Sequence, residues 1–470
     1  MRGRTRTGAV TGGMSYGAAR AVARSTPRGA ARGPAVRGAA VRGAAMAAAL
    51  VLVLPLGGCR LTGGPEAVAT GSCAGQQVTG ITEDTVKVGG IYPLSGPASA
   101  YGLIASGVRA YFGHVNDGGG VDGRKIEFLV RDDGYQPARA VEEVRRLVEL
   151  EEVFTIFQTV GTPSTAAVRD YAGRRRVPQV FVATGASRWG TDGGYPWTIG
   201  YQPSYVAEAR VYAQHLKETM PWATVAVLYQ NDDFGRDLRD GFADAIRGSE
   251  VRIVAEQSYE VTDPGVQGQL ANLASSGADV LLSVTTPKFG AQALAVDAAV
   301  TSWNPLHILN SVAVSPAVME TVDTGKVPEI VSAVYQKDPA NPEWEDDPAV
   351  EVYRRSLLSY APEADPAAPQ TVFGWTVAQA FVEALRRMEC PTREGLLEAV
   401  RNLDDVPVDT LLPGITLSTG PGDGFPIESM MLARFEEGHW APFGKVIDTR
   451  AVFGPVRTAS EDSPAGSSAG

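Results

Sequence analysis

From residue 85 onward, short apolar runs alternate with longer segments in which apolar residues recur every three or four positions. The short runs are rich in Val, Ile and Phe and predict buried strands at 86–91, 126–131, 154–158, 179–183, 224–229, 252–257, 280–284 and 307–309. The longer segments predict helices near 103–116, 137–150, 164–173, 204–219, 235–248, 266–276 and 289–302. Two more helical patterns, near 371–388 and 392–402, precede a β-like segment that ends near residue 447.

This alternation of strands and helices predicts an α/β fold with parallel sheets. Ligands of such folds bind at the carboxyl ends of the strands. The strands form two sets that are separated near Tyr201, so we expect two similar lobes.

The N-terminal segment has the pattern of an export signal. Nine Arg precede a run of 13 apolar or small residues at 44–56, which is too short for a comfortable membrane span. The run ends in Leu56-Gly57-Gly58-Cys59, which resembles the lipobox of bacterial lipoproteins; a cleavage site with an incidental Cys is the alternative. We expect a signal peptide at 1–58, lipidation of Cys59 at the outer face of the cell membrane, a flexible tether at 59–77 and a disordered tail at 457–470.

Composition narrows the class of protein. Apolar residues make up 44% and charged residues 20% of the 470 residues, which is an ordinary globular mixture. Of the 42 Lys and Arg, nine lie within residues 1–58, which leaves 33 against 53 Asp and Glu. A body this acidic argues against nucleic acid as a partner. The four His lack close metal-ligand spacing and there is no Cys-x-x-Cys, so we expect no metal site and no cofactor.

Export also changes the interpretation of two cysteines. Cys73 and Cys390 would lie in an oxidising compartment, where a disulfide can join the end of the tether to a C-terminal helix. Two unpaired thiols are the alternative, because the sequence does not give the distance between them.

A series of polar turns then points to a known family. The series reads PLSGP at 93–97, YG at 101–102, NDGGGVDGR at 116–124 and RDD at 131–133, and continues at 161–165, 177–187 and 225–235. Its order and spacing resemble the branched-chain-amino-acid type of solute-binding protein, the extracytoplasmic receptor of an ABC importer. The resemblance covers residues 85 to about 450.

The resemblance implies two Rossmann-like lobes that are joined by three hinge strands and close on a ligand between them. Hinge crossings would fall near 200–201, 331–333 and 413–414. Lobe 1 would then contain residues 78–200 and 333–412, and lobe 2 residues 201–332 and 413–456. The implied partners are a small-molecule ligand, an ABC permease with its ATPase, and the membrane through the lipid; we expect a monomer.

In lobe 1, the resemblance and the strand ends select three loops as ligand contacts. In the turn that begins at Gly161, Thr162 and Ser164 would hold a carboxylate, although Ser164 is also a good helix N-cap. The next strand end supplies three candidates, and Tyr101 would pack on the ligand unless it is an exposed loop residue. The three candidates are Ala183, Thr184 and Gly185.

In lobe 2, Phe234 would form an apolar wall, while Asp233 is expected to cap the following helix. Thr285, Ser311 and Tyr335 follow other strands, and Lys337 is expected to be solvated. Leucine receptors of the family carry an aromatic near Thr285 and a carboxylate near Ser311. This chain has small polar residues at both places, which weakens the amino-acid interpretation because a buried unpaired ammonium is costly. Amides, urea-like compounds and aromatic carboxylates are the other ligands that the family implies.

Other functions remain to be weighed against transport. The same clamp in a ligand sensor would signal to a membrane partner, and this chain alone does not separate the two roles. An extracytoplasmic hydrolase is disfavoured because the sequence has no GxSxG or HExxH and its Ser-rich loops lack a partner His. We therefore expect a binding protein and not an enzyme.

Overall fold

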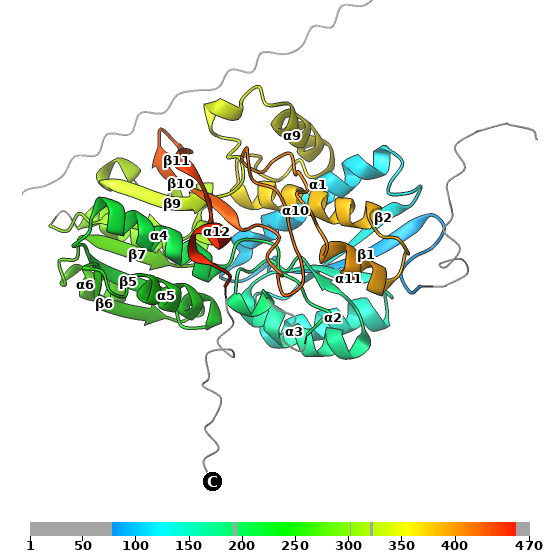
Figure 1. The fold of residues 1–470 in the computed structure, drawn as a ribbon, viewed down its shortest axis with the longest axis horizontal. Coiled ribbons are helices and arrows are strands. Elements are labelled where there is room, and N and C mark those ends of the chain that lie inside the picture. Colours follow the sequence, from blue (N-terminus) through cyan, green and yellow to red (C-terminus); the bar gives the residue numbers. More distant parts are fainter. Residues whose placement is uncertain (1–77, 191–194, 301, 320–322, 457–470) are drawn as a thin grey trace, which may run out of the picture. The chain divides into compact units, whose positions relative to one another are not determined.

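The computed structural model describes residues 78–190, 195–300, 302–319 and 323–456, and two sheets organise this part of the chain (Figure 1). The first sheet is parallel and has the order β2-β1-β3-β4. Its strands are β1 (Thr85–Tyr92), β2 (Lys125–Asp132), β3 (Thr155–Thr159) and β4 (Gln179–Val180). We call this sheet, with the helices that pack on it, lobe 1.

The second sheet has seven strands in the order β11-β10-β9-β8-β7-β5-β6 and, with its helices, forms lobe 2. Its strands are β5 (Thr224–Gln230), β6 (Arg252–Tyr259), β7 (Val280–Val284), β8 (Leu306–Leu309), β9 (Glu329–Val334), β10 (Ser429–Glu436) and β11 (His439–Asp448). Strands β5 to β9 are parallel to one another, and β10 and β11 are antiparallel additions. The predicted α/β class with two parallel-dominated sheets is confirmed.

Helices cover both faces of each sheet, because successive residues of the strands point to opposite faces and both sets are apolar. In β5, Val225 and Val227 pack toward one core cluster while Ala226 and Leu228 pack toward another. The helices of lobe 1 are α1 (Leu103–Asp117), α2 (Pro137–Glu149), α3 (Thr162–Arg175), α9 (Pro348–Tyr360), α10 (Pro369–Arg386) and α11 (Arg393–Val400). Those of lobe 2 are α4 (Tyr205–Thr219), α5 (Asp233–Ala245), α6 (Gln267–Ala274), α7 (Pro287–Ala299), α8 (Pro316–Met319) and α12 (Thr449–Phe453).

Several elements differ from the sequence prediction. β4 ends at Val180, three residues early, because Phe181 takes a φ of 53° that a strand cannot continue. Helix α9 was not predicted, although Asp347 accepts hydrogen bonds from its first amides as an N-cap. Short 3₁₀ turns also join the larger elements. They are η1 (Ser99–Gly102), η2 (Ser187–Trp189), η3 (Ser311–Ala313), η4 (Thr324–Lys326) and η5 (Pro342–Trp344).

The predicted crossing at 331–333 lies inside β9, so the chain leaves the lobe 2 sheet only after Val334. Beyond it, the Tyr335 carbonyl accepts from the Leu412 amide at 3.0 Å, which places two connecting segments side by side. Lys337 is buried there and not solvated. Its Nζ donates to Asp347 Oδ2 at 2.7 Å and to the Asp409 carbonyl at 2.8 Å, since a buried ammonium needs such partners.

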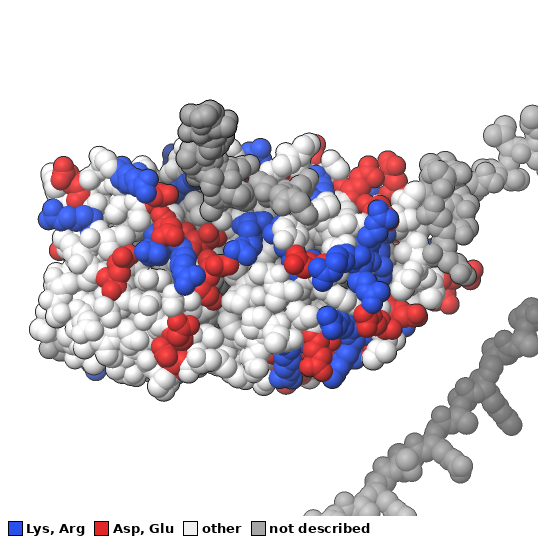
Figure 2. Space-filling view, turned by 90° about the horizontal axis from the view of Figure 1, so that it is seen from below, with Lys and Arg blue, Asp and Glu red and all other residues white. Residues whose placement is uncertain are grey.

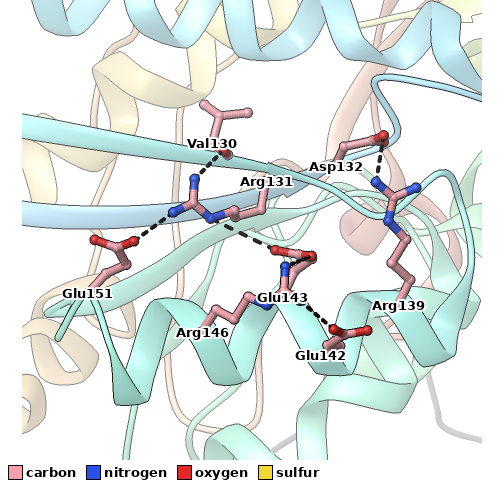
Figure 3. Close-up of polar contacts among 8 residues, drawn as sticks. All are labelled: Val130, Arg131, Asp132, Arg139, Glu142, Glu143, Arg146 and Glu151. Carbon is pink, nitrogen blue, oxygen red and sulfur yellow. Dashed lines mark hydrogen bonds and ion pairs between the residues drawn. The ribbon is translucent and has the colours of Figure 1, made fainter.

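Ion pairs fasten α2 to the edge strand β2 (Figure 3). Arg131 of β2 contacts Glu151 at 2.8 Å and the largely buried Glu143 of α2 at 3.9 Å. Arg139 of α2 reaches back to Asp132 at 3.0 Å. Because these groups are partly exposed, each pair contributes at most about 1 kcal/mol, and the apolar contacts of α2 with the sheet carry most of the stability. Basic and acidic side chains likewise lie next to one another on the face shown in Figure 2.

A carboxylate pair near the C-terminal end of the fold makes stability depend on pH. Arg450 of α12 pairs with Asp423 and, at 3.3 Å, with Glu428. Burial, with repulsion from Asp423, raises the pKa of Glu428 to about 7 from 4.5. A folded state with the higher pKa binds the proton more tightly, so this contribution is complete below the unfolded pKa and is lost as pH rises through the folded pKa.

We therefore expect the unfolding midpoint of the wild type to fall between about pH 5 and pH 8 relative to a Glu428→Gln variant, which lacks the titrating group. Thermal unfolding followed by circular dichroism at several pH values measures this difference. Midpoints of the two proteins that run parallel across this range would contradict the assignment to Glu428.

Candidate ligand-binding site

A pocket lies between lobe 1 and lobe 2 and holds about 610 Å³ of empty space, part of it open to solvent. Its wall is mainly aromatic and aliphatic, and its polar members are uncharged. The six rings are Tyr101, Tyr135, Tyr205, Phe234, Tyr335 and Phe373. The remaining lining residues are Ile104, Val160, Gly161, Ala183, Gln202, Thr286, Ser311, Val312, Val314, Gln336, Pro369 and Gln370.

The pocket forms where parallel strands of both sheets end. Gly161 follows β3, Phe234 follows β5, Thr286 follows β7, Ser311 follows β8 and Tyr335 follows β9. The carboxyl ends of parallel strands meet at one edge of a sheet, which is why loops distant in sequence come together here.

Five of the ten predicted ligand contacts line this pocket, and their role in binding stays a prediction. They are Tyr101, Ala183, Phe234, Ser311 and Tyr335. The other five do not line it. They are Thr162, Ser164, Thr184, Gly185 and Thr285.

Three hydroxyl groups of the second set, those of Thr162, Ser164 and Thr184, are engaged inside lobe 1. Thr162 Oγ1 and Thr184 Oγ1 are 2.6 Å apart, and the Ala186 amide donates to the latter at 3.3 Å. Ser164 donates to Asp133 Oδ2 at 2.6 Å and is not the N-cap of α3, because the helix already begins at Thr162. These hydroxyls therefore hold the loops in place.

Glycine at two positions of these loops is required by close contacts. Gly161 has a φ of 89°, and a Cβ there would lie 2.4 Å from the Tyr135 ring. A Cβ at Gly185 would lie 2.4 Å from the Pro203 carbonyl oxygen.

In lobe 2, the Thr285 amide donates to Asn310 Oδ1 at 2.8 Å, while the Thr285 hydroxyl is buried without a partner.

Contacts between the lobes surround the pocket. Tyr101 Oη donates to the Val312 carbonyl at 3.2 Å, and Gln370 Nε2 donates to the Val314 carbonyl at 2.7 Å. At another point, the Ser187 amide donates to Asp237 Oδ2 at 2.5 Å. The two halves of the wall are thus held together by hydrogen bonds.

The N-cap of α5 lies one residue before the expected Asp233. Asp232 is the N-cap, since its side chain accepts from the Gly235 amide at 3.1 Å. Asp233 instead pairs across the lobes with Arg188. The Asp232 carboxylate therefore caps the helix, and the Asp233 carboxylate joins the lobes.

Three helices begin at the pocket without a side-chain cap. They are α3, α7 and α10, whose N-caps are Gly161, Thr286 and Ala368. Each helix has a Pro without an N–H in its first two positions, so few first-turn amides remain for a ligand. They are those of Thr162 and Ser164 in α3, Lys288 in α7 and Gln370 in α10. These amides and the positive dipole ends favour electron-rich ligand groups such as a carbonyl or carboxylate oxygen. These helix starts supply backbone donors.

One buried carboxylate stands behind the wall. Glu208 of α4 is 1% exposed and does not line the pocket. Its Oε1 accepts from the Ser311 amide and from the Tyr212 hydroxyl, each at 2.7 Å, and its Oε2 accepts from Ser311 Oγ at 2.7 Å. Burial raises the pKa of Glu208, whereas these three donors act in the opposite direction.

A profile of the family described as Periplasmic binding protein matches residues 85–439. The chain belongs to this family. "Leu/Ile/Val-binding protein homolog 7" of Brucella suis is 28% identical over 213 residues, which is 43% of this chain and 52% of that protein. The chain thus spans about half the length of the curated relatives it matches.

Solved structures share the fold of this periplasmic binding protein at low identity. A branched chain amino acid ABC transporter structure from Thermus thermophilus, with bound valine, has a TM-score of 0.71 at 17% identity and covers 79% of this chain and 100% of that chain. A solute binding protein of R. palustris in complex with benzoate has a TM-score of 0.65 at 18% identity and covers 77% and 96%. The family indicates an extracytoplasmic location and a binding role, not an enzymatic one.

A hydrogen-bonded Ser–His–Asp chain occurs in the core of the binding protein. Ser283 Oγ lies 2.9 Å from His307 Nε2, and His307 Nδ1 lies 2.8 Å from Asp297 Oδ2. All three residues are at most 2% exposed and none lines the pocket, so substrate has no access to them. The chain ties β7, β8 and α7 together.

The remaining sequence predictions fall largely outside the described residues. Cys59, Cys73, the signal peptide, the tether and the tail all lie there. Cys390 is disulfide-bonded, and its partner is not among the described residues. Within the described ranges no helix is long and apolar enough to cross a membrane, and no group of three or more His, Cys, Asp or Glu could hold a metal ion.

Several residues of the pocket wall are not among those that the sequence predicted. Tyr135 follows β2 and could have been selected by the strand-end rule that selected Phe234. Gln336 and Gln370 lie on a connecting segment and at a helix start, and no periodic pattern marks them. Their importance comes from contacts between segments distant in sequence.

Proposed function

We propose that this periplasmic binding protein is a lipid-anchored receptor that closes on a small organic ligand and delivers it to an ABC permease and its ATPase. The observation that carries the proposal is the pocket between the lobes, with six rings on its wall and hydrogen bonds joining its two halves. A ligand that contacts both lobes stabilises the closed form, which a permease can then distinguish from the open form.

The pocket favours an amide, a urea-like compound or an aromatic carboxylate over leucine-like amino acids. None of the described residues that line it is charged, so the ammonium of an amino acid would lack a carboxylate partner there. Among the described residues, Glu208 is the carboxylate that accepts hydrogen bonds from Ser311. Three donor groups already bond to its two oxygens. The valine and benzoate named for two structural neighbours indicate that the fold accepts different ligands.

Anchoring to the membrane rests on the N-terminal sequence alone. The apolar run at 44–56 and the Leu-Gly-Gly-Cys that ends at Cys59 support export and lipidation. A Cys73–Cys390 disulfide would tie the tether to lobe 1, and the disulfide-bonded state of Cys390 supports this pairing. Lobe 1 would then be the part held nearest the anchor.

A thermal-shift screen tests the proposal on protein that starts after Cys59. The panel contains amino acids, amides, ureas and aromatic acids. A ligand at 1,000 times its Kd stabilises the folded state by about 4 kcal/mol, so a true ligand shifts the midpoint plainly. We expect hits among amides, ureas or aromatic acids, with leucine and valine silent. A clear shift with leucine would contradict the ligand class, and silence across the panel would contradict all the classes named here.

A further inference from the structure

Four polar side chains of the pocket wall each donate a hydrogen bond to another protein group and keep an oxygen that can accept. Tyr101 Oη donates to the Val312 carbonyl at 3.2 Å, and Ser311 Oγ donates to Glu208 Oε2 at 2.7 Å. Gln336 Nε2 donates to the Pro369 carbonyl at 2.9 Å, and Gln370 Nε2 donates to the Val314 carbonyl at 2.7 Å. We call Tyr101, Ser311, Gln336 and Gln370 the acceptor set.

The two glutamines show most directly that the wall offers hydrogen-bond acceptors to a ligand. Because a backbone carbonyl can only accept, each side-chain nitrogen must face the carbonyl, and each Oε1 must point elsewhere. Both Oε1 atoms are buried without a partner, and Gln370 as a whole is only 6% exposed. A buried acceptor without a hydrogen-bond partner costs free energy, so a ligand that donates to these oxygens would gain affinity.

Glu208 fixes the polarity of Ser311. A carboxylate only accepts, so the serine proton is held toward Glu208 and the oxygen lone pairs remain for the pocket. Glu208 is a positioning residue, since it acts on the ligand through Ser311. The bonds of Tyr101 and Gln370 to Val312 and Val314 place these acceptors along the same segment that begins at Ser311.

The uncapped helix starts of the pocket present hydrogen-bond donors, which need an acceptor from the ligand. There the amides of Thr162 and Ser164, at the start of α3, have no side-chain acceptor. At the start of α7, Pro287 has no N–H and the first amide is that of Lys288. In addition, Thr286 Oγ1 is buried without a partner. A ligand that satisfies the wall therefore has both N–H donors and a carbonyl acceptor. A carboxylate has no donor, and an ammonium has no acceptor and brings a charge into an uncharged wall.

We propose that the ligand carries a neutral H₂N–C=O group, as in a primary carboxamide or a urea, on an apolar body that packs against the aromatic rings. Its N–H groups donate to the acceptor set, and its carbonyl accepts from the helix starts. This assignment rests on the proposed function, and among the ligand classes of that proposal it selects the amide and urea class over the aromatic carboxylates.

Matched ligand pairs test the assignment by calorimetric titration of the wild type. The probes are benzamide with benzoate, phenylurea with phenylacetate, and hexanamide with hexanoate. We expect the H₂N–C=O member of a binding pair to be at least about tenfold tighter, since its partner leaves buried acceptors unpaired. A carboxylate that binds as tightly or more tightly would overturn the assignment while leaving the receptor function intact. Binding by no member of any pair would overturn both.

The Glu208→Gln variant tests the polarity of Ser311 itself. Its new amide nitrogen can donate to Ser311 Oγ, which frees the serine proton to point into the pocket. We expect benzamide to bind about tenfold more weakly and benzoate to bind more tightly than to the wild type. A purely structural role of Glu208 would instead weaken both ligands alike, and that result would overturn the assignment.

The Ser311→Ala variant keeps the test informative if Glu208→Gln does not fold. It removes one acceptor without adding a donor, so we expect weaker binding of benzamide and unchanged binding of benzoate. Equal losses for the two ligands would contradict the acceptor role of Ser311. The unfolding midpoint of each unliganded variant serves as the control for an intact fold.

Discussion

The Gly107→Val variant should lose the stable fold of lobe 1, because α1 and α10 pack with their backbones in contact. A Cβ at Gly107 would lie 1.9 Å from the Thr371 carbonyl oxygen. On the facing helix, a Cβ at Gly374 would lie 2.0 Å from the Ile104 carbonyl oxygen. Neither backbone can move without separating the helices, so we expect a loss of about 3 kcal/mol or more in the free energy of unfolding, or no soluble protein.

Urea unfolding of purified protein measures this loss, and Gly173→Ala in α3 is the matched control. No heavy atom lies within 4 Å of the position of its new Cβ. Alanine is the better helix former, so the control should gain about 0.5–1 kcal/mol. A Gly107→Val protein with the wild-type midpoint would show that the two helices are not packed as described.

The Phe234→Ala variant should bind ligand about 10 to 100 times more weakly, because the side chain forms the apolar wall that lobe 2 contributes. Phe234 is 2% exposed, lines the pocket and packs against the Tyr205 ring with centroids 5.0 Å apart. Its removal takes away contact surface and leaves a gap that water can enter. Calorimetric titration with the best ligand of the thermal-shift screen measures the change.

Two further variants separate loss of binding from loss of fold. Trp222 is 74% exposed, so Trp222→Ala should leave affinity unchanged. Phe234→Leu keeps an apolar side chain of moderate size and should bind with intermediate affinity. If Phe234→Ala bound as tightly as the wild type, the ligand would not rest on this wall.

The order of the elements could be predicted because each lobe is a layered α/β structure with helices on both faces. A strand buried on both faces has a continuous apolar run, as at 225–228 of β5. In a helix on such a sheet, apolar residues recur every three or four positions. The errors occur where backbone conformation and not burial decides the element. Phe181 is apolar and fully buried, yet its positive φ ends β4.

The site could be predicted only as far as strand ends define it. Tyr101 and Phe234 were found because relatives and loop positions select them, and both line the pocket. Thr162 and Ser164 were expected to face the ligand, but their hydroxyls bond to Thr184 and Asp133 within lobe 1. Whether a hydroxyl faces a ligand or a neighbouring loop depends on contacts across many residues, and a local pattern does not contain them.

The partners of buried charged residues could not be predicted from the local sequence either. Lys337 was expected in solvent, because an isolated Lys in a polar segment is usually exposed. Its partner Asp347 lies ten positions later, beyond a short turn, and the pair is buried together. Glu208 similarly reaches Ser311 across 103 residues.

A crystal structure of the protein with the best ligand of the screen would show directly whether the ligand binds between the lobes. We expect ligand density in contact with Tyr101, Phe234 and Tyr335 and within hydrogen-bonding distance of the acceptor set. Density at any other place, with this pocket unchanged by the ligand, would contradict this expectation.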